Sequence, residues 1–406
     1  MRPIDRGTTP AVPRTPPLGR AALATAVVFA VNGFLLAAWV SRLPATRDRL
    51  GASAAELGLV LLTPGFGSLL SMPSSGRWCR RFGSRAAVAA TTVAASVALV
   101  GLAVVPTLVT LGLALFAWGS FYGSWDVAMN VHGSAVEQRA GREWMPRYHA
   151  SWSVGGIAGA GCGALAAHAG MPLALHFGVV AVLCTALVMV ALRSFIEDRA
   201  VAPTPGTPKP PRSARARVLT GRLLLVGAVT LCATTLEGAA ADWLALYLTD
   251  ERGATQSLAA FGYAVFAVAM AGGRFSGTAV AERLGRHGAV RVGGMVSFVG
   301  VLVTVLGPGI GSAYAGAVLW ALGVCLVFPA AVSAGGEAPE RPADAIAAVT
   351  TIGYGGFLVG PPLIGLLAEQ VGLGRALLVL LVLAAGIATL APAVRSRSMV
   401  PSPRGG

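Results

Sequence analysis

The stretch RLLLVGAVTLCATTLEGAAADWLALYL at residues 222–248 decides the fold class of this chain. It exceeds the roughly 20 apolar residues that a helix needs to cross the hydrocarbon core of a bilayer. The run nevertheless contains two acids, Glu237 and Asp242. Charged side chains are costly inside lipid and usually face a cavity or a partner. The stretch therefore predicts a membrane-spanning helix that borders a polar site.

Further apolar runs of similar length fill most of the remaining sequence. A strand of a membrane barrel needs only about ten residues, so runs of this length predict helices. The low share of charged residues, 12%, excludes an ordinary soluble enzyme, a coiled coil and a disordered protein, because soluble domains carry about 25%. We expect twelve spans at 20–41, 55–75, 86–106, 108–131, 150–170, 173–194, 222–248, 257–275, 288–308, 312–335, 344–367 and 373–394.

The basic residues lie mostly in the short gaps between these runs and indicate the orientation of the helices. Of the 31 Lys and Arg residues, 26 fall near the two termini or after the second, fourth, sixth, eighth and tenth spans. Because such residues stay on the cytoplasmic side, both termini and the longest gap are expected in the cytoplasm. The net charge of +14 is spread over many gaps, which argues against a nucleic-acid binder.

Six spans, a long Pro-rich gap and six more spans predict a protein built from two halves. The fold class is therefore an all-α membrane protein, with twelve transmembrane helices in two pseudo-symmetric bundles. A Pro-rich basic linker is expected to be extended and solvated. We expect a disordered tail at 1–19, a bundle at 20–195, a cytoplasmic linker at 196–221, a second bundle at 222–395 and a disordered tail at 396–406.

A short basic motif occurs once in each half, on the predicted cytoplasmic side. The first copy is Gly76-Arg-Trp-Cys-Arg80-Arg81-Phe-Gly83-Ser-Arg85, and the second contains Glu282-Arg283-Leu-Gly285-Arg286. One interpretation is a cytoplasmic gate, which would include the Arg at the end of the eighth span. The other is that these arginines only fix the topology. The gate candidates are Gly76, Arg81, Gly83, Arg85, Arg274, Glu282, Arg283, Gly285 and Arg286.

This motif resembles the loop after the second helix of the major facilitator superfamily, which reads Gly-x-x-x-Asp-Arg-x-Gly-Arg-Arg. In that family the acid pairs across helices and holds the outward-facing state. Arg80 stands at the position of the acid, whereas Glu282 keeps an acid in the second copy. The resemblance therefore implies the pairing role for Glu282 and not for Arg80.

Several stretches narrow the resemblance to YbjJ-like inner-membrane proteins. They include Asn32-Gly33, Trp125–His132, Glu237–Trp243 and Gly353–Pro362. The chain is more distantly similar to the fucose permease group of proton-coupled sugar importers. In that group the fourth helix carries an acid, three residues and then Asn, as Asp126 and Asn130 do here. The resemblance implies proton-coupled transport of a sugar-like metabolite.

The predicted fourth span carries a stripe of polar and aromatic side chains. Trp118, Tyr122, Asp126 and Asn130 recur every four residues, which places them along one face of a helix. A carboxyl group beside an amide and two aromatic rings is suited to binding hydroxyl groups or holding a proton. The alternative is a structural acid that pairs with an Arg or a helix terminus.

The two acids of the seventh span, Glu237 and Asp242, lie at different depths. Asp242 is about 7 Å further toward the outside, and five residues put the two about 140° apart around a helix. We expect one of them to face a cavity and the other to pack against a neighbouring helix or the outer mouth. Glu237 is deeper and joins Asp126 as a proton-coupling candidate. Asp242 is a third candidate, with a structural role at the outer mouth as the favoured alternative.

Further cavity candidates lie in the first, seventh and eleventh spans. They are Asn32, Trp39, Arg42, Trp243 and Tyr354. Asn32 and Trp39 are seven residues apart, so they share a face of a helix. Arg42 is expected to pair with Asp242 or Asp48, or to bind an anionic group of the substrate. For each candidate the alternative is structural: core packing, or a side chain at the membrane interface.

The sequence predicts a gradient-driven transporter rather than an enzyme. It has no Gly-x-x-x-x-Gly-Lys-Ser/Thr loop, so a nucleotide is not expected as the energy source. No His or Cys spacing suggests a metal site, and no cofactor is expected. We expect a monomer in a bacterial inner membrane that moves a small polar metabolite with protons by alternating access. The alternative is a proton-coupled efflux pump for lipophilic or cationic compounds.

Overall fold

The computed structural model describes residues 17–52, 56, 59–198, 220–254, 256–338 and 341–396. These residues form helices and short connections, without a strand among them. The expected all-α class is therefore confirmed for the described part of the chain. The predicted tails at 1–19 and 396–406 and the predicted linker at 196–221 lie almost entirely outside it.

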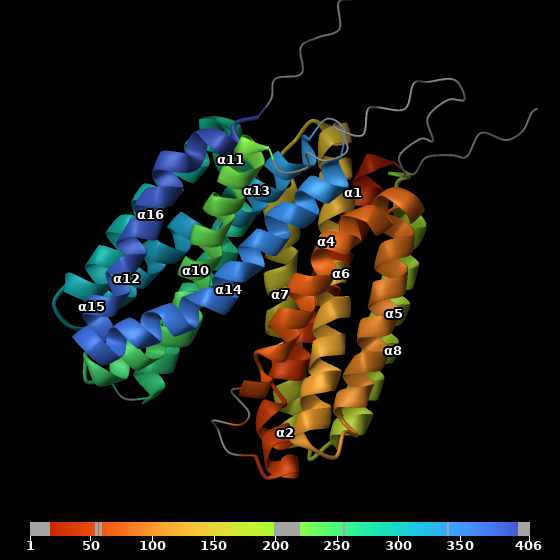
Figure 1. The fold of residues 1–406 in the computed structure, drawn as a ribbon, viewed down its shortest axis with the longest axis horizontal. Helices are drawn as coiled ribbons and strands as arrows, with labels where there is room; N and C mark the ends of the chain where they lie inside the picture. Colours follow the sequence, from red (N-terminus) through yellow and green to blue (C-terminus); the bar gives the residue numbers. More distant parts are fainter. Residues whose placement is uncertain are drawn as a thin grey trace, which may run out of the picture.

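Six long helices of the first half pack into one bundle, at the right of Figure 1. The short helix α2 (Leu43–Leu50) follows the first of them, and the turn η1 (Leu192–Ser194) follows the last. The six are α1 (Leu18–Val40), α4 (Thr63–Phe82), α5 (Ser84–Leu102), α6 (Leu108–Ala140), α7 (Met145–His168) and α8 (Leu173–Ala191).

The second half also forms six spans, at the left of Figure 1. Helix α11 supplies two of them, and α12 with α13 and α15 with α16 each form one interrupted span. The helices are α10 (Gly221–Asp250), α11 (Gln256–Leu306), α12 (Gly309–Val324), α13 (Val327–Gly336), α14 (Pro342–Val371), α15 (Leu373–Leu377) and α16 (Val379–Leu390), followed by η2 (Ala391–Val394).

Both copies of the repeated motif turn the chain at a glycine. Gly83 separates α4 from α5 with φ 82° and ψ 155°, and Gly285 bends α11 with φ 68° and ψ 160°. Side chains other than glycine rarely adopt such positive φ angles. The motif is therefore the same sharp turn in both halves, which supports the internal repeat seen in the sequence.

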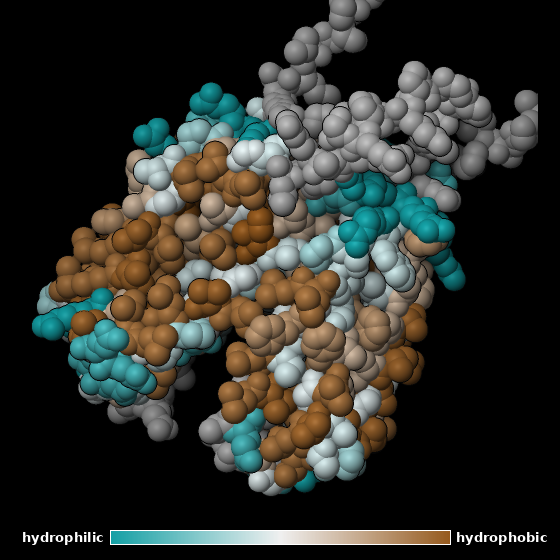
Figure 2. All heavy atoms as spheres, viewed as in Figure 1, coloured by the Kyte–Doolittle hydropathy of each residue, from teal (hydrophilic) through white to brown (hydrophobic). Residues whose placement is uncertain are grey.

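Most of the long helices are apolar enough to cross a membrane. Nine helical segments meet this criterion among the described residues, and one of them contains both arms of α11. The two long helices that do not are α4 and α7, which contact α14 and α11 of the other bundle. Their lower hydropathy therefore fits a place at the interface between the bundles. Figure 2 shows hydrophobic side chains over the middle of both bundles and hydrophilic ones gathered at the two ends.

Several helices continue beyond the apolar runs from which they are predicted. Helix α4 begins at Thr63 and ends at Phe82, so its predicted span at 55–75 is displaced. Helix α6 runs to Ala140, well past the predicted end at 131. An apolar run marks only the part of a helix inside the hydrocarbon, and polar turns extend the helix beyond it.

The two bundles meet at one end of the molecule and diverge toward the other (Figure 1). At the closed end, a Cβ atom on Gly76 would lie 2.7 Å from the carbonyl oxygen of Ala343, and one on Gly277 would lie 2.6 Å from Cβ of Pro146. The two glycines therefore permit close contact between the bundles. Each bundle also packs around a large apolar core, built mainly from its own residues.

Candidate functional site

A cavity of about 740 Å³ lies between the two bundles. Figure 2 shows the hollow opening at the end opposite the bundle contacts, which we call the open end. Helices of both bundles supply the walls, and aromatic rings are prominent in them. The lining includes Trp118, Tyr122, Trp152, Tyr263, Tyr354 and Phe357, together with Glu237, Asp242 and Arg274.

An ion pair forms part of the cavity wall. The buried Arg274 guanidinium donates from Nη2 to both carboxylate oxygens of Glu237, at 3.1 and 3.2 Å. Its Nη1 donates to Ser153 Oγ of the first bundle at 3.0 Å, and its Nε donates to the carbonyl oxygen of Cys325 at 3.4 Å. Arg274 therefore joins an acid of the second bundle to a hydroxyl group of the first.

The sequence predicts Arg274 at the cytoplasmic end of the eighth span, but the structure places it in the cavity wall. The first arm of α11 continues past Arg274 to the bend at Gly285. The apolar run ends near Arg274 because this side chain faces the cavity and its counter-ion, not because the helix ends there.

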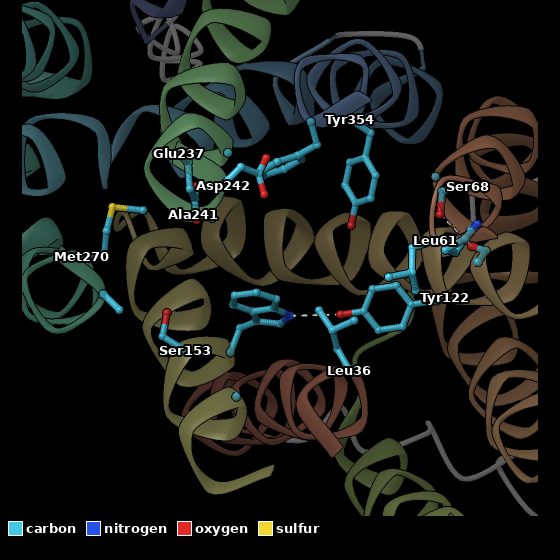
Figure 3. Close-up of a pocket in the computed structure, with 18 of the residues that line it drawn as sticks. Leu36, Leu61, Ser68, Tyr122, Ser153, Glu237, Ala241, Asp242, Met270 and Tyr354 are labelled. Atoms are coloured by element: carbon cyan, nitrogen blue, oxygen red, sulfur yellow. Dashed lines mark hydrogen bonds between the residues drawn. The ribbon is translucent and has the colours of Figure 1, made fainter. Parts of the chain in front are cut away.

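The outer part of the α6 stripe forms a wall of the cavity, as Figure 3 shows for Tyr122. The rings of Trp118 and Tyr122 are stacked, with centroids 5.0 Å apart. Trp152 Nε1 donates to Asn32 Oδ1 at 3.0 Å and to the Tyr122 hydroxyl at 3.3 Å. Asn32 itself is fully buried. It therefore acts behind the wall by holding Trp152 and Tyr122 in place.

Asp126, on the same stripe, lies behind the lining of the cavity. Its side chain is buried, and Asn130 donates to its backbone oxygen at 2.8 Å and to Oδ1 at 3.4 Å. Oδ2 has no hydrogen-bond partner among the described residues. Tyr354 lines the cavity and interacts with the same carboxyl group. Tyr354 therefore stands between Asp126 and the cavity.

Asp242 lies on the cavity wall together with Glu237 (Figure 3). The expectation that only one of these acids faces the cavity is therefore wrong. The cavity extends around α10, with Tyr263 of α11 and Phe357 of α14 both in its lining. Because the cavity borders α10 on two sides, side chains about 140° apart around this helix can both face the cavity.

Three other candidates do not line the cavity. Arg42 is buried and donates from Nη2 to the carbonyl oxygen of Met171 at 2.7 Å, so its expected pairing with Asp242 is wrong. Trp39 packs inside the first bundle, with its ring centroid 6.0 Å from that of Phe177. Trp243 packs near Gly365 of α14. Seven-residue spacing showed that Asn32 and Trp39 share a face of α1, but not which neighbour that face meets.

Ion pairs hold the bundles together at the closed end. Arg286 donates from Nη2 to Glu143 at 2.6 Å and from Nη1 to Glu337 at 2.7 Å. Glu143 belongs to the connection between α6 and α7, so this arginine joins the two halves. Arg142 of the same connection pairs with Glu282 at 2.9 Å. Glu282 therefore pairs with the connection between α6 and α7 of the other bundle, and its role in holding the outward-facing state stays a prediction.

Arg80 also pairs across the bundles, which the resemblance did not imply. Its partner is Asp344 on the first turn of α14, and Arg341 donates to the same carboxylate at 2.6 Å. In the family pattern the first half carries the acid at this position. Here the first half carries the cation, Arg80, and the second half carries the anion, Asp344. The gate candidates Arg81, Arg85 and Arg283 are exposed, and Arg81 lies over the ring of Phe82.

Several residues of the site were missed in the sequence. Trp152, Ser153 and Tyr263 line the cavity, and Glu143 and Asp344 pair at the closed end. Spacing along one helix reveals a stripe, but it does not show which stripes of different helices meet. Glu143 and Asp344 each lie close to a Pro in the first turn of a helix, which was the available signal.

Comparison with known proteins agrees with this architecture. Residues 21–361 match the model of the Major Facilitator Superfamily. The chain is 35% identical over 378 residues to the uncharacterized transporter y4wD of Sinorhizobium fredii (strain NBRC 101917 / NGR234), covering 90% of this chain and 96% of that protein. It is 30% identical to the membrane protein MosC of Rhizobium meliloti, covering 94% and 92%.

Solved structures share the fold at low sequence identity. The transporter FucP in its outward conformation aligns with a TM-score of 0.78 and 14% identity, covering 93% of this chain and 99% of that one. The human organic anion transporter MFSD10 (TETRAN) aligns with a TM-score of 0.72 and 14% identity, covering 93% and 100%. Family model, relatives and fold agree: this multi-pass membrane protein belongs to the Major Facilitator Superfamily.

Proposed function

We propose that this transporter is a secondary active, proton-coupled carrier that moves a small polar metabolite across a bacterial inner membrane by alternating access. One observation carries the proposal. The cavity lies between the two bundles, is open at one end and is closed at the other by ion pairs that join the bundles. Transporters with internal repeats place their site at such an interface and expose it by rocking one half against the other.

The basic residues support an assignment of sides to this state. The motif around Gly83 and Gly285 lies at the closed end, and the positive-inside rule puts that motif in the cytoplasm. The structure then corresponds to an outward-open state. Opening toward the cytoplasm requires the pairs of Arg80, Arg142 and Arg286 to separate.

The pair of Glu237 and Arg274 provides a means of coupling to protons. Protonation of Glu237 removes the charge that balances the buried Arg274 guanidinium. Leaving one charge of a buried pair uncompensated is strongly unfavourable. Arg274 also binds Ser153 of the first bundle, so its rearrangement acts on the contact between the halves. Asp126, behind Tyr354, is the second proton-coupling group in this proposal.

The lining supports a polar metabolite such as a sugar. Aromatic rings offer flat apolar surfaces to a sugar ring, and Ser68, Ser153 and the tyrosine hydroxyl groups offer hydrogen bonds. Ligand sites commonly combine such an apolar wall with a few placed polar groups.

The coupling is tested by measuring the distance across the open end without any substrate. The five free cysteines would first be replaced, and spin labels placed at the exposed positions Val104 and Leu306. Double electron–electron resonance is expected to show two distances whose ratio changes between pH 5.5 and 8. In the Asp126→Asn, Glu237→Gln double variant the ratio is expected to be constant. A single distance at every pH, or the same pH dependence in the double variant, contradicts the proposal.

A further inference from the structure

We infer that the transported metabolite carries a protonated amine together with hydroxyl groups, and that Asp242 recognises the amine. The inference rests on the proposed transport function and names its substrate class. It follows from three features of the cavity: an acid without a partner, the aromatic rings around it, and a hydrogen-bond donor without an acceptor on the opposite bundle.

The first feature is the charge balance of the lining. Among the described residues that line the cavity, the acids are Glu237 and Asp242, and the one base is Arg274. Glu237 is neutralised by its two bonds to Arg274. Asp242 is exposed to the cavity and has neither a hydrogen bond nor an ion pair among the described residues. The cavity therefore offers a bound cation an unpaired carboxylate.

The aromatic rings near Asp242 favour the same kind of ligand. The Tyr263 side chain interacts electrostatically with Asp242, and its ring is stacked on Phe266 with centroids 6.4 Å apart. Figure 3 shows Asp242 and Tyr354 pointing into the same space. A cation is attracted to the face of an aromatic ring. An ammonium group beside Asp242 therefore gains both a counter-ion and aromatic neighbours.

The third feature lies across the cavity, on the first bundle. Trp118 lines the cavity and is 2% exposed, and its Nε1–H has no acceptor among the described residues. A buried donor without an acceptor is unfavourable, so a ligand oxygen that accepts from it gains affinity. A hydroxyl group supplies such an oxygen.

The two groups lie at similar depths. Trp118 is ten residues from the start of α6, and Asp242 is eight residues from the end of α10. At 1.5 Å per residue, these positions are about 15 and 12 Å from helix ends that both lie at the open end. The two groups therefore face the cavity at matching depths from opposite bundles, and the inference places the amine of the ligand at Asp242 and an oxygen at Trp118.

Matched pairs of ligands test the inference by thermal shift. The probes are glucosamine against glucose and N-acetylglucosamine, and N-methylglucamine against sorbitol. Since a ligand that binds the native state stabilises it, the two amines are expected to raise the Tm by several degrees at 10 mM. Equal shifts with the neutral partners, no shift with either amine, or a shift with tetraphenylphosphonium alone would overturn the inference.

Two variants assign the interaction to its residues. Asp242→Asn is expected to weaken amine binding by about 10- to 100-fold, because a charge-assisted bond is lost. Trp118→Phe keeps a ring but removes the donor, and a loss of about 3- to 10-fold is expected. Asp250→Asn is the matched control, because this exposed acid at the end of α10 bonds to Thr249 and not to the cavity. Unchanged amine binding in Asp242→Asn would overturn the assignment.

A failure of the amine inference can be distinguished from a failure of the transport proposal. If the protein binds the amines but shows a single distance between the spin labels at every pH, alternating access is contradicted and amine recognition by Asp242 still holds. Two pH-dependent distances without amine binding would keep the transporter and reject the amine.

Discussion

Arg80 of α4 and Asp344 of α14 form an ion pair between the two bundles. The family motif has an acid at the position that Arg80 occupies here. Asp344 also binds Arg341, so one carboxylate serves two guanidinium groups. Its side chain is 7% exposed and that of Arg80 is 29% exposed. The pair is therefore partly shielded from solvent, and it closes the same end of the molecule as Arg286.

Removing this pair should favour opening of the closed end. We expect Arg80→Gln to raise the population of the open form by about 2- to 5-fold, since a partly exposed pair contributes about 0.5–1 kcal/mol. Asp344→Asn should act more strongly, because it leaves the guanidinium groups of Arg80 and Arg341, on opposite bundles, without the carboxylate that both contact. Spin labels at the exposed positions Arg85 and Arg283 would report the distance. Equal effects from Arg85→Gln, tested with the label of Arg85 moved to Arg81, would show that the pair is not responsible.

A side chain at Gly76 should prevent closure by its bulk. In Gly76→Ala the new Cβ would meet the backbone of Ala343 and Asp344 at 2.7 Å. Forcing atoms into a packed contact costs about 1–3 kcal/mol, so the closed population should fall by about tenfold. Gly101→Ala is the control, because a Cβ there meets nothing within 4 Å. The same pair of spin labels measures both variants, and a closed end that persists in Gly76→Ala would refute the expectation.

The pair of Glu237 and Arg274 should show strong non-additivity in thermal unfolding. Glu237→Gln leaves the buried guanidinium without its counter-ion, which costs about 3–5 kcal/mol for a buried pair. Replacing both residues, in Glu237→Gln with Arg274→Gln, should be less destabilising than either single change. Tm values of the purified variants provide the measurement. Ser153→Ala, which removes one neutral partner of Arg274 and leaves its counter-ion in place, is the control. Additive losses would exclude a mutually neutralising pair.

Asp126 should control the pH response without controlling recognition. Its carboxyl group is buried behind Tyr354 and does not line the cavity. Asp126→Asn should therefore flatten the dependence of the conformational ratio on pH and leave the amine affinity within about twofold of the original value. Tyr354→Phe should weaken the pH response in part, because it removes the polar contact to this carboxyl group. Loss of amine binding in Asp126→Asn would place this acid in the recognition site instead.

The spans were predictable because bilayer thickness sets the length of an apolar run. The repeated turn was visible as well, since a glycine marks both Gly83 and Gly285. Helix ends were less predictable: Arg274 ends an apolar run, yet its helix continues through polar turns outside the hydrocarbon. Apolarity reports the environment of a segment rather than its backbone conformation.

The candidate site was predictable only along single helices. The α6 stripe could be recognised from spacing, because its members lie on one helix. The pairing of Glu237 with Arg274, and of Arg80 with Asp344, joins different helices and depends on how these pack. Arg42 illustrates the limit, because a buried arginine near the open end is held by a backbone carbonyl rather than by an acid.

Each half of the chain packs mainly around its own apolar core, and the halves touch through glycines, ion pairs and the buried apolar side chains Val332, Ala343, Ile346 and Ala347 of the second half. The interface therefore combines a few charges of defined sign, a few positions without side chains and a small set of apolar contacts. Hybrids that join one half of this protein to the other half of a relative need to match only those positions. Such hybrids separate the contribution of each half to substrate choice, because Trp118 belongs to the first half and Asp242 to the second.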